Sequence, residues 1–157
     1  MRPIVSENLN WSSIIGHFLL NFGALEITLL EILKGRVKEG AWNALKKESF
    51  YDRVLRLRKL GSDGPFESID DGLLKRLEAV RDDRNYLAHS TLVNTFSEDL
   101  KSCTQRLVLI KDYAFAEGRV KKVSMEELLQ QNQDLADLVG ELLAVLERQK
   151  SQAGNAV

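Results

Sequence analysis

Apolar residues recur at helical spacing in four stretches of this chain. Within about residues 8–34, 38–60, 69–87 and 125–150 they return every three or four positions, the spacing that places side chains on one face of an α-helix. The expected core face of the first helix comprises Ile15, Phe18, Leu19, Phe22, Leu25, Leu29, Leu30 and Leu33. Its opposite face carries His17, Asn21, Thr28 and Glu31. The last helix is expected to bury Leu128, Leu135, Leu138, Leu142 and Val145.

The segments between these stretches carry turn and strand signals. The run Gly61-Ser62-Asp63-Gly64-Pro65 is a strong stop and turn signal. Residues 104–113 and 119–123 are rich in β-formers and flank Glu117-Gly118, which favours a β-hairpin. Ser124 and Glu127 have the spacing of a capping box at the start of the last helix.

These elements predict one mainly α-helical domain over residues 1–150, built as an antiparallel four-helix up-and-down bundle. A β-hairpin insertion of about residues 92–123 is expected between the third and fourth helices, and residues 151–157 are expected to form a frayed tail. In the second helical region, the clearest apolar row is Phe50, Val54 and Leu57, and the helical pattern weakens near residues 47–49.

Composition and charge disfavour several classes of protein and of site. A formal net charge of −1 creates no whole-molecule field that attracts nucleic acid, so such binding would depend on a local patch. The single Cys103 cannot form an internal disulfide, which agrees with a reducing compartment. The most apolar stretch, residues 14–33, is interrupted by polar residues and favours an amphipathic helix over a membrane span. We expect a cytoplasmic protein without a metal site or cofactor, since no ligand spacing or glycine-rich phosphate loop is present.

Arg84 breaks the apolar pattern of the third helix. The positions that share one face there, by steps of four, three, four and three, are Leu73, Leu77, Val80, Arg84 and Leu87. Burying an arginine in such a row is costly unless its charge is paired or used. An ion pair with Glu26, a carboxylate within the apolar face of the first helix, is one interpretation. A phosphate site that uses Arg84 is the other, and the two are compatible because a carboxylate can orient a working arginine.

His89 follows Arg84 where the third helix is expected to end. Positions five apart lie about 140° apart around a straight helix, so one regular helix does not aim both side chains at the same point. Either the helix distorts at its end, or a second copy of the chain supplies the convergence in a twofold dimer packed on this helix. Alternatively, His89 is only a terminal histidine that interacts with the last helix carbonyls.

An arginine and a histidine held together suit metal-free phosphate chemistry. Arginine keeps its charge and presents a planar fork of donors to a phosphate, and histidine exchanges a proton near neutral pH. Together they could support attack of a ribose 2′-hydroxyl on the neighbouring phosphodiester, with Arg84 stabilising charge on the phosphoryl oxygens. Arg81 and Asn85 flank the same position.

The run Arg84-Asn85-Tyr86-Leu87-Ala88-His89 resembles the R-x4-6-H motif of the HEPN superfamily (higher eukaryotes and prokaryotes nucleotide-binding). The layout is similar too, with the motif late in the third long helix and a final helix after it. The resemblance implies a dimeric four-helix domain, often a metal-independent ribonuclease of toxin–antitoxin or phage-defence systems. Carried onto this chain, it makes Arg84 and His89 the catalytic pair and Asn85 the supporting polar residue.

The sequence therefore leaves two hypotheses for the function. The first is a metal-independent endoribonuclease that acts as a homodimer through the motif helix on RNA, with a cognate antitoxin or nucleotidyltransferase as a further partner. The second is a non-catalytic HEPN-like dimeric module that binds a partner protein or nucleotide, in which Arg84 is locked into an ion pair.

Basic residues supply a candidate RNA-contacting surface. Those singled out for the RNA backbone are Arg53, Arg56, Lys59, Arg119 and Lys121. Cationic side chains that contact phosphates give a salt-dependent affinity that does not depend on sequence. Charge runs of this kind more often form a solvated helix face, and that remains the simpler interpretation for any single one of them.

Overall fold

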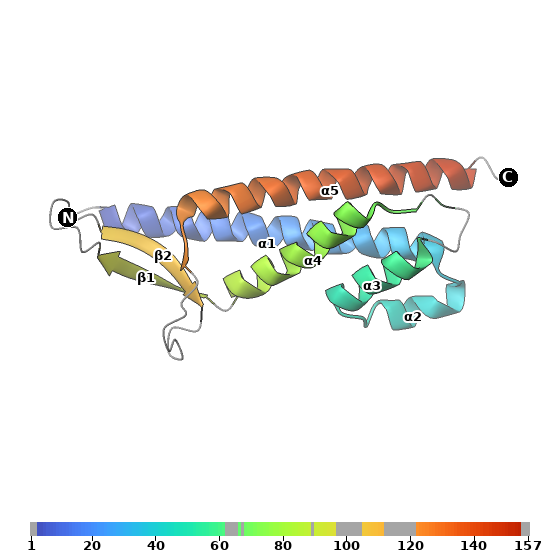
Figure 1. The fold of residues 1–157 in the computed structure, drawn as a ribbon, viewed down its shortest axis with the longest axis horizontal. Coiled ribbons are helices and arrows are strands. Elements are labelled where there is room, and N and C mark those ends of the chain that lie inside the picture. The colour runs from blue at the N-terminus through green and yellow to red at the C-terminus, as the bar shows by residue number, and fades with distance from the viewer. Residues whose placement is uncertain are drawn as a thin grey trace.

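The computed structural model describes residues 3–61, 66, 68–88, 90–96, 105–111 and 122–154. The chain is mainly helical, as its apolar periodicity predicts (Figure 1). Its helices are α1 (Pro3–Arg36), the 3-10 helix η1 (Glu39–Ala41), α2 (Trp42–Leu45), α3 (Phe50–Leu60), α4 (Asp71–Ala88) and α5 (Met125–Gly154). Its strands are β1 (Ser90–Phe96), β2 (Gln105–Lys111) and β3 (Lys122–Val123).

The core is built from the faces that the spacing predicts, with local exceptions in α1. Phe18, Leu25 and Leu29 are fully buried. Leu19, expected in the core, is 44% exposed. Thr28, expected on the polar face, is buried, and its hydroxyl donates a hydrogen bond to the Ala24 carbonyl at 2.9 Å. Because that bond satisfies the hydroxyl, its burial leaves no polar group unpaired.

Helices α1 and α5 run parallel to each other, which differs from the alternation of an up-and-down bundle. The Asn132 amide donates to the Ile14 carbonyl near one end, and the Gln149 amide donates to the Ile32 carbonyl near the other. The second helical region is split into α2 and α3, and α2 carries the chain back before α3 begins (Figure 1). This extra reversal gives the last helix the direction of the first.

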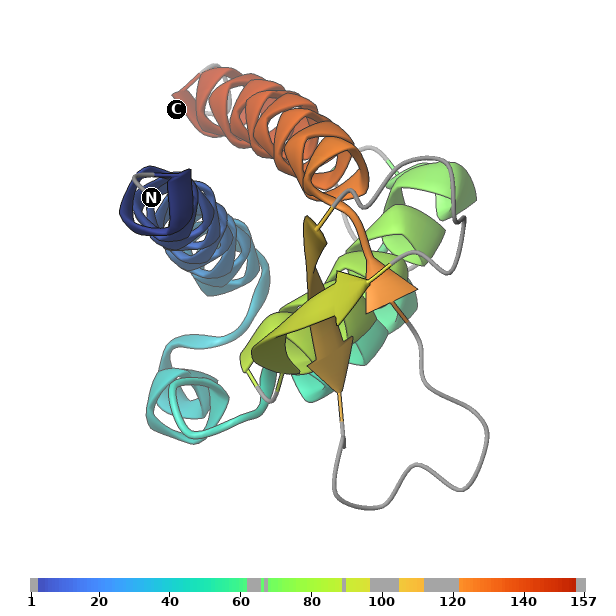
Figure 2. The ribbon, with the colours of Figure 1, turned by 90° about the vertical axis from the view of Figure 1, so that its left-hand side faces the viewer.

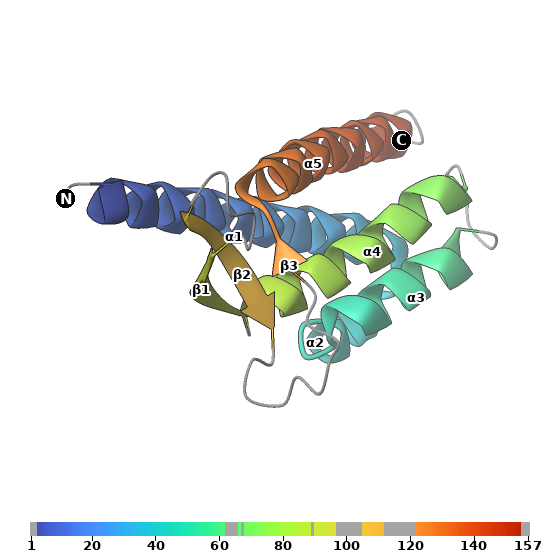
Figure 3. The same ribbon diagram turned by 60° about the vertical axis from the view of Figure 1, so that its left-hand side comes forward.

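The remaining helices close the core on the other side of α1. Phe50, Val54 and Leu57 of α3 are buried, so the predicted apolar row is confirmed. Helix α4 lies beside α3 and crosses in front of α1 (Figures 1 and 3). Arg58 of α3 pairs with Glu78 of α4 at 3.0 Å, and Arg76 of α4 forms an ion pair with Glu141 of α5.

A three-stranded antiparallel sheet lies at the end of the molecule where α4 finishes (Figure 3). Its order is β1-β2-β3, with Val93 opposite Val108 and Leu109 opposite Val123. Strands β2 and β3 lie within the two segments whose composition predicts strands, whereas β1 lies in a segment for which no strand is predicted. The expected turn at Glu117-Gly118 lies outside the described residues.

The capping box predicted at the start of α5 is formed. The Ser124 backbone N–H donates to a Glu127 carboxylate oxygen at 2.7 Å, and the Glu127 N–H donates to Ser124 Oγ at 3.2 Å. At its other end α5 continues to Gly154, so residues 151–154 of the expected frayed tail are helical.

Replacing Ser124 with alanine is expected to lower the free energy of unfolding by about 1 kcal/mol, since one N-terminal amide of α5 loses its acceptor. Urea denaturation monitored by circular dichroism measures this change. The exposed Ser151, whose hydroxyl donates to the Glu147 carbonyl within the last turns of α5, provides the control, and Ser151→Ala should have a smaller effect. Equal effects of the two substitutions would contradict the role of the cap.

Helix α1 also contains a long apolar segment. By length and composition alone, Trp11–Arg36 could cross a membrane, with 26 residues and a hydropathy of 1.5. The buried core helix of a soluble protein passes the same test. Several α1 side chains do belong to the core, where Phe18, Leu25 and Ile32 are 0% exposed.

Candidate functional site

Helix α4 delivers Arg84 to one end of the core. The Asp70 carboxylate accepts a hydrogen bond from the Leu73 N–H at 3.0 Å, which caps the start of the helix. Leu73, Leu77 and Val80 are buried along the predicted row. Arg84 shares their row but is exposed, so the expected cost of burying its charge does not arise. Its helix position faces a surface pocket instead of the core.

The contacts of Arg84 leave its charge without a carboxylate partner among the described residues. Its Nη1 donates to Asn85 Oδ1 at 3.3 Å, and its guanidinium carbon lies 5.9 Å from the centre of the Phe22 ring, within the range of a cation–π contact. The ion pair expected with Glu26 is not formed, although Glu26 lines the same pocket. Arg84 therefore remains available to an anion.

The pocket beside Arg84 has a volume of about 260 Å³ and joins α1, α3 and α4. Its lining residues are Phe22, Glu26, Ser49, Phe50, Tyr51, Arg81, Arg84 and Asn85. Four residues singled out in the sequence, Glu26, Arg81, Arg84 and Asn85, thus meet at one place. Guanidinium groups beside aromatic rings suit a ligand that has both an anionic group and a flat ring.

The aromatic wall of this pocket is not predicted by the sequence pattern. The apolar periodicity predicts Phe22 and Phe50 only as core residues. Each is buried, and their ring centres lie 5.0 Å apart. Tyr51 received no role, but it is 39% exposed. The sequence signal that could have indicated this wall is the aromatic Tyr51, directly after Phe50 of the buried α3 row.

The second arginine of the pocket differs from the first in its electrostatics. Arg81 donates to Asp82 Oδ1 from Nε at 3.0 Å and from Nη2 at 2.7 Å, and this hydrogen bonding raises the pKa of Arg81. Its guanidinium carbon lies 4.6 Å from the centre of the Tyr51 ring. Because Asp82 offsets its charge and Tyr51 fixes its position, Arg81 is better suited to shape the pocket than to neutralise a phosphate.

His89 cannot be placed relative to Arg84. Helix α4 ends at Ala88 and β1 begins at Ser90, and His89 lies outside the described residues. Arg119 and Lys121, two of the basic candidates, lie outside them as well. The convergence of Arg84 and His89 therefore stays a prediction.

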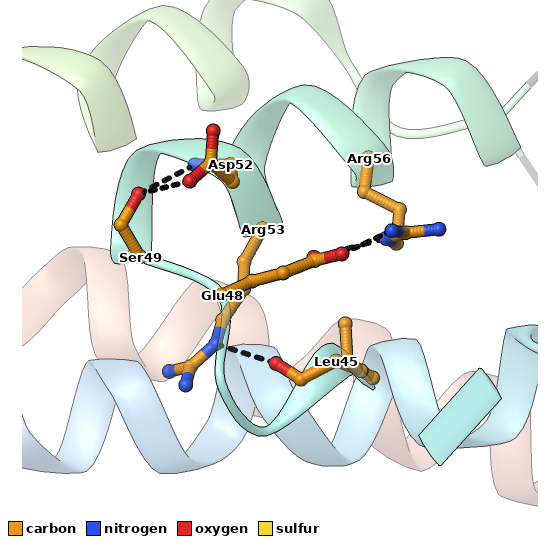
Figure 4. A network of polar contacts seen from close by, with 6 residues as sticks. All are labelled: Leu45, Glu48, Ser49, Asp52, Arg53 and Arg56. Atoms are coloured by element: carbon orange, nitrogen blue, oxygen red, sulfur yellow. Dashed lines mark hydrogen bonds and ion pairs between the residues drawn. The ribbon is translucent and has the colours of Figure 1, made fainter. Parts of the chain in front are cut away.

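Two basic residues of α3, Arg53 and Arg56, hold the connection between α2 and α3 (Figure 4). Arg53 donates to the Leu45 carbonyl at 3.4 Å (Figure 4) and to the Lys46 carbonyl at 3.0 Å. Arg56 forms a two-pronged ion pair with Glu48, and this hydrogen bonding raises the pKa of Arg56. These two side chains thus stabilise the connection between α2 and α3. Lys59, the third candidate on α3, is exposed.

The start of α3 forms one wall of the pocket and is firmly capped. Ser49 Oγ accepts a hydrogen bond from the Asp52 N–H at 3.2 Å and donates to Asp52 Oδ2 at 2.6 Å (Figure 4). Such a cap fixes the direction in which a helix begins. Ser49 and Tyr51 are in this way held beside Arg81 and Arg84.

Acidic, histidine and cysteine side chains do not gather into a group of three or more that could hold a metal ion within the described part of the chain. No protein-family model, curated protein or solved structure matches the chain.

Proposed function

We propose that this chain is a metal-independent endoribonuclease of the HEPN type. The observation that carries the proposal is the exposed Arg84 guanidinium, which lines a pocket beside Asn85 and has no carboxylate partner among the described residues. An unpaired guanidinium next to aromatic rings is a suitable receptor for the phosphodiester and base of an RNA strand.

In the proposed reaction, the ribose 2′-hydroxyl attacks the adjacent phosphorus atom and the bond to the 5′-oxygen breaks. The products are a 2′,3′-cyclic phosphate and a free 5′-hydroxyl. His89 accepts the proton of the attacking hydroxyl, and Arg84 stabilises the negative charge that develops on the phosphoryl oxygens. The leaving 5′-oxygen takes a proton from water, and the protonated His89 then returns its proton to the solvent. Asn85 holds the Arg84 guanidinium through the hydrogen bond at 3.3 Å.

Two further observations support this proposal. The competing hypothesis of a non-catalytic module expects Arg84 to be locked in an ion pair, and Arg84 has none among the described residues. The described part of the motif, Arg84 to Ala88, also lies at the end of α4, the third long helix, with α5 as the final helix, which agrees with a HEPN-like helical domain carrying a β-sheet insertion. A cytoplasmic toxin or defence role with a cognate antitoxin belongs to the same proposal.

The two histidines of the chain allow a matched test. The purified protein is expected to cleave RNA in the presence of a chelator, and His89→Ala should abolish cleavage because His89 is the proposed general base. His17 is exposed on α1, so His17→Ala should cleave like the parent. Expression of the three proteins in cells should show toxicity for the parent and His17→Ala alone. Unchanged cleavage by His89→Ala would refute the proposed reaction.

A further inference from the structure

The pocket beside Arg84 contains a carboxylate as well as guanidinium groups. Glu26 is partly buried on α1 and lines the pocket, but its carboxylate forms no hydrogen bond or ion pair within the described part of the chain. Figure 2 shows α1 and α4 as separate helices, so Glu26 and Arg84 enter the pocket from different sides. A carboxylate that loses water without gaining a partner is costly, which indicates that a ligand supplies its hydrogen-bond donors.

Opposite charges in one pocket select a ligand that has two different ends. Phe22 and Glu26 are four residues apart, so they are neighbours on the same face of α1. The Phe22 ring is the one that Arg84 contacts, at 5.9 Å, and Glu26 lies one helical turn, about 5.4 Å, along α1 from it. A ligand that meets both charges therefore carries an anionic group and, apart from it, a set of N–H donors.

The wall between these charges suits a flat ring. The Arg81 guanidinium carbon lies 4.6 Å from the centre of the Tyr51 ring, and Tyr51 is 39% exposed. Nucleobases stack on aromatic rings and on guanidinium planes. The volume of about 260 Å³ is just below the range of about 300–1,000 Å³ that is usual for ligand pockets, so the pocket suits a single nucleotide.

Among the four bases of RNA, guanine is the one that matches a carboxylate. A carboxylate only accepts hydrogen bonds. The Watson–Crick edge of guanine presents two adjacent donors, N1–H and the N2 amino group. Adenine and cytosine present one amino donor beside a ring-nitrogen acceptor, and uracil presents one donor between two carbonyl acceptors. Both carboxylate oxygens are therefore satisfied together by guanine alone, because each other base turns an acceptor toward one of them.

We propose that Glu26 is a specificity-determining residue that selects guanine in the nucleotide whose phosphate Arg84 binds. Its two oxygens accept from N1–H and from the N2 amino group, and such charge-assisted pairs are strong and directional. Stacking alone would not discriminate, since every base has a flat face. The chain then cleaves RNA beside guanosine. That consequence rests on the proposed ribonuclease function, whereas the preference for guanine in binding does not.

Calorimetric titration with guanosine, inosine and adenosine 5′-monophosphates tests this preference without any cleavage. Inosine differs from guanosine only by lacking the N2 amino group. The parent should bind the guanosine nucleotide about 10-fold more tightly than the inosine nucleotide, and about 10–100-fold more tightly than the adenosine nucleotide. Glu26→Gln keeps the size of the side chain but replaces one acceptor with a donor, so it should bind all three with similar affinity.

Glu31→Gln is the matched control for Glu26→Gln. Glu31 is an exposed carboxylate on the same helix, lies 3.9 Å from Lys34 and does not line this pocket. The control removes the same charge and should leave the guanine preference unchanged. Arg84→Ala should weaken binding of all three nucleotides and keep their order, because it acts on the phosphate that they share. Thermal unfolding checks that each variant is folded.

Several results would overturn the selection of guanine by Glu26. They are equal binding of the three nucleotides by the parent, binding of none of them, an unchanged preference in Glu26→Gln, and a lost preference in Glu31→Gln. Tighter binding of free phenylalanine than of the guanosine nucleotide would also overturn it, because the pocket would then hold a zwitterion.

Cleavage of an RNA of mixed sequence separates this inference from the proposed function. If the parent cleaves beside all four bases alike, the selection of guanine is refuted and the ribonuclease remains. If the parent prefers the guanosine nucleotide in binding but cleaves no RNA, the ribonuclease is refuted and the guanine site remains. Cleavage beside guanosine that becomes independent of the base in Glu26→Gln supports both.

Discussion

Arg84→Ala should reduce the rate of RNA cleavage by about 10²–10³-fold, the usual loss when one donor to a developing oxyanion is removed. The loss should appear in kcat more than in KM, because the guanidinium acts mainly on charge that develops in the transition state. The fold should be unaffected, since Arg84 is exposed and its described contacts are one hydrogen bond and one ring contact. Single-turnover cleavage of a labelled RNA over a range of protein concentrations measures the rate and the apparent affinity. Thermal unfolding measures the stability of the fold.

Arg81→Ala is the matched control for this substitution. Arg81 lines the same pocket, but Asp82 already offsets its charge, so its loss should reduce cleavage less than the loss of Arg84. Arg84→Lys should lie between the parent and Arg84→Ala, because lysine keeps the charge and loses the planar fork. Equal losses for Arg81→Ala and Arg84→Ala would show that the pocket needs positive charge in general rather than the guanidinium of Arg84.

Gly35→Ala should destabilise the protein in the parent chain and stabilise it when Gln149 is also replaced. An added side-chain carbon at Gly35 would overlap Gln149 Nε2. Gln149 is 6% exposed, donates to the Ile32 carbonyl at 3.0 Å and accepts from Arg36 Nε at 2.8 Å. Displacing it disturbs both bonds, at about 1–3 kcal/mol, and alanine regains about 1 kcal/mol of helix propensity.

The sign of the change in stability caused by Gly35→Ala should depend on the residue at position 149. In the Gln149→Ala background only the gain in helix propensity remains, so Gly35→Ala should raise the free energy of unfolding by about 1 kcal/mol. Gly140→Ala, on an open helical face, should be stabilising in both backgrounds. Urea denaturation of the double-mutant cycle measures the coupling. If Gly35→Ala changes the free energy of unfolding with the same sign in both backgrounds, the contact between α1 and Gln149 of α5 does not limit which residue position 35 tolerates.

Periodicity predicted the helical elements well because each buried row is a local property. Phe50, Val54 and Leu57 share a face whatever lies opposite, and the Ser124–Glu127 cap needs only its own backbone. The same reasoning placed Thr28 on the polar face and Leu19 in the core, and both assignments were wrong. A helical wheel ranks directions around one helix, but the neighbouring helices decide how wide the covered arc is.

The candidate site was predictable in its members and not in its geometry. Glu26, Arg81, Arg84 and Asn85 were named from the sequence, and they do line one pocket. The expected Arg84–Glu26 ion pair does not form, and the aromatic wall that includes Tyr51 was not foreseen. Whether two opposite charges touch depends on distances across α1 and α4, and spacing along either helix carries no information about those distances.

By itself the sequence determined which stretches are helical, which rows are apolar and which polar residues interrupt them. The tertiary structure alone decided that α1 and α5 run parallel, that Arg84 meets solvent at a pocket instead of the core, and that Leu20 and Ile27 of α1 are exposed. The physical reason is that hydrogen bonding and periodicity act within one helix, whereas direction, exposure and free surface depend on contacts between residues far apart in the chain.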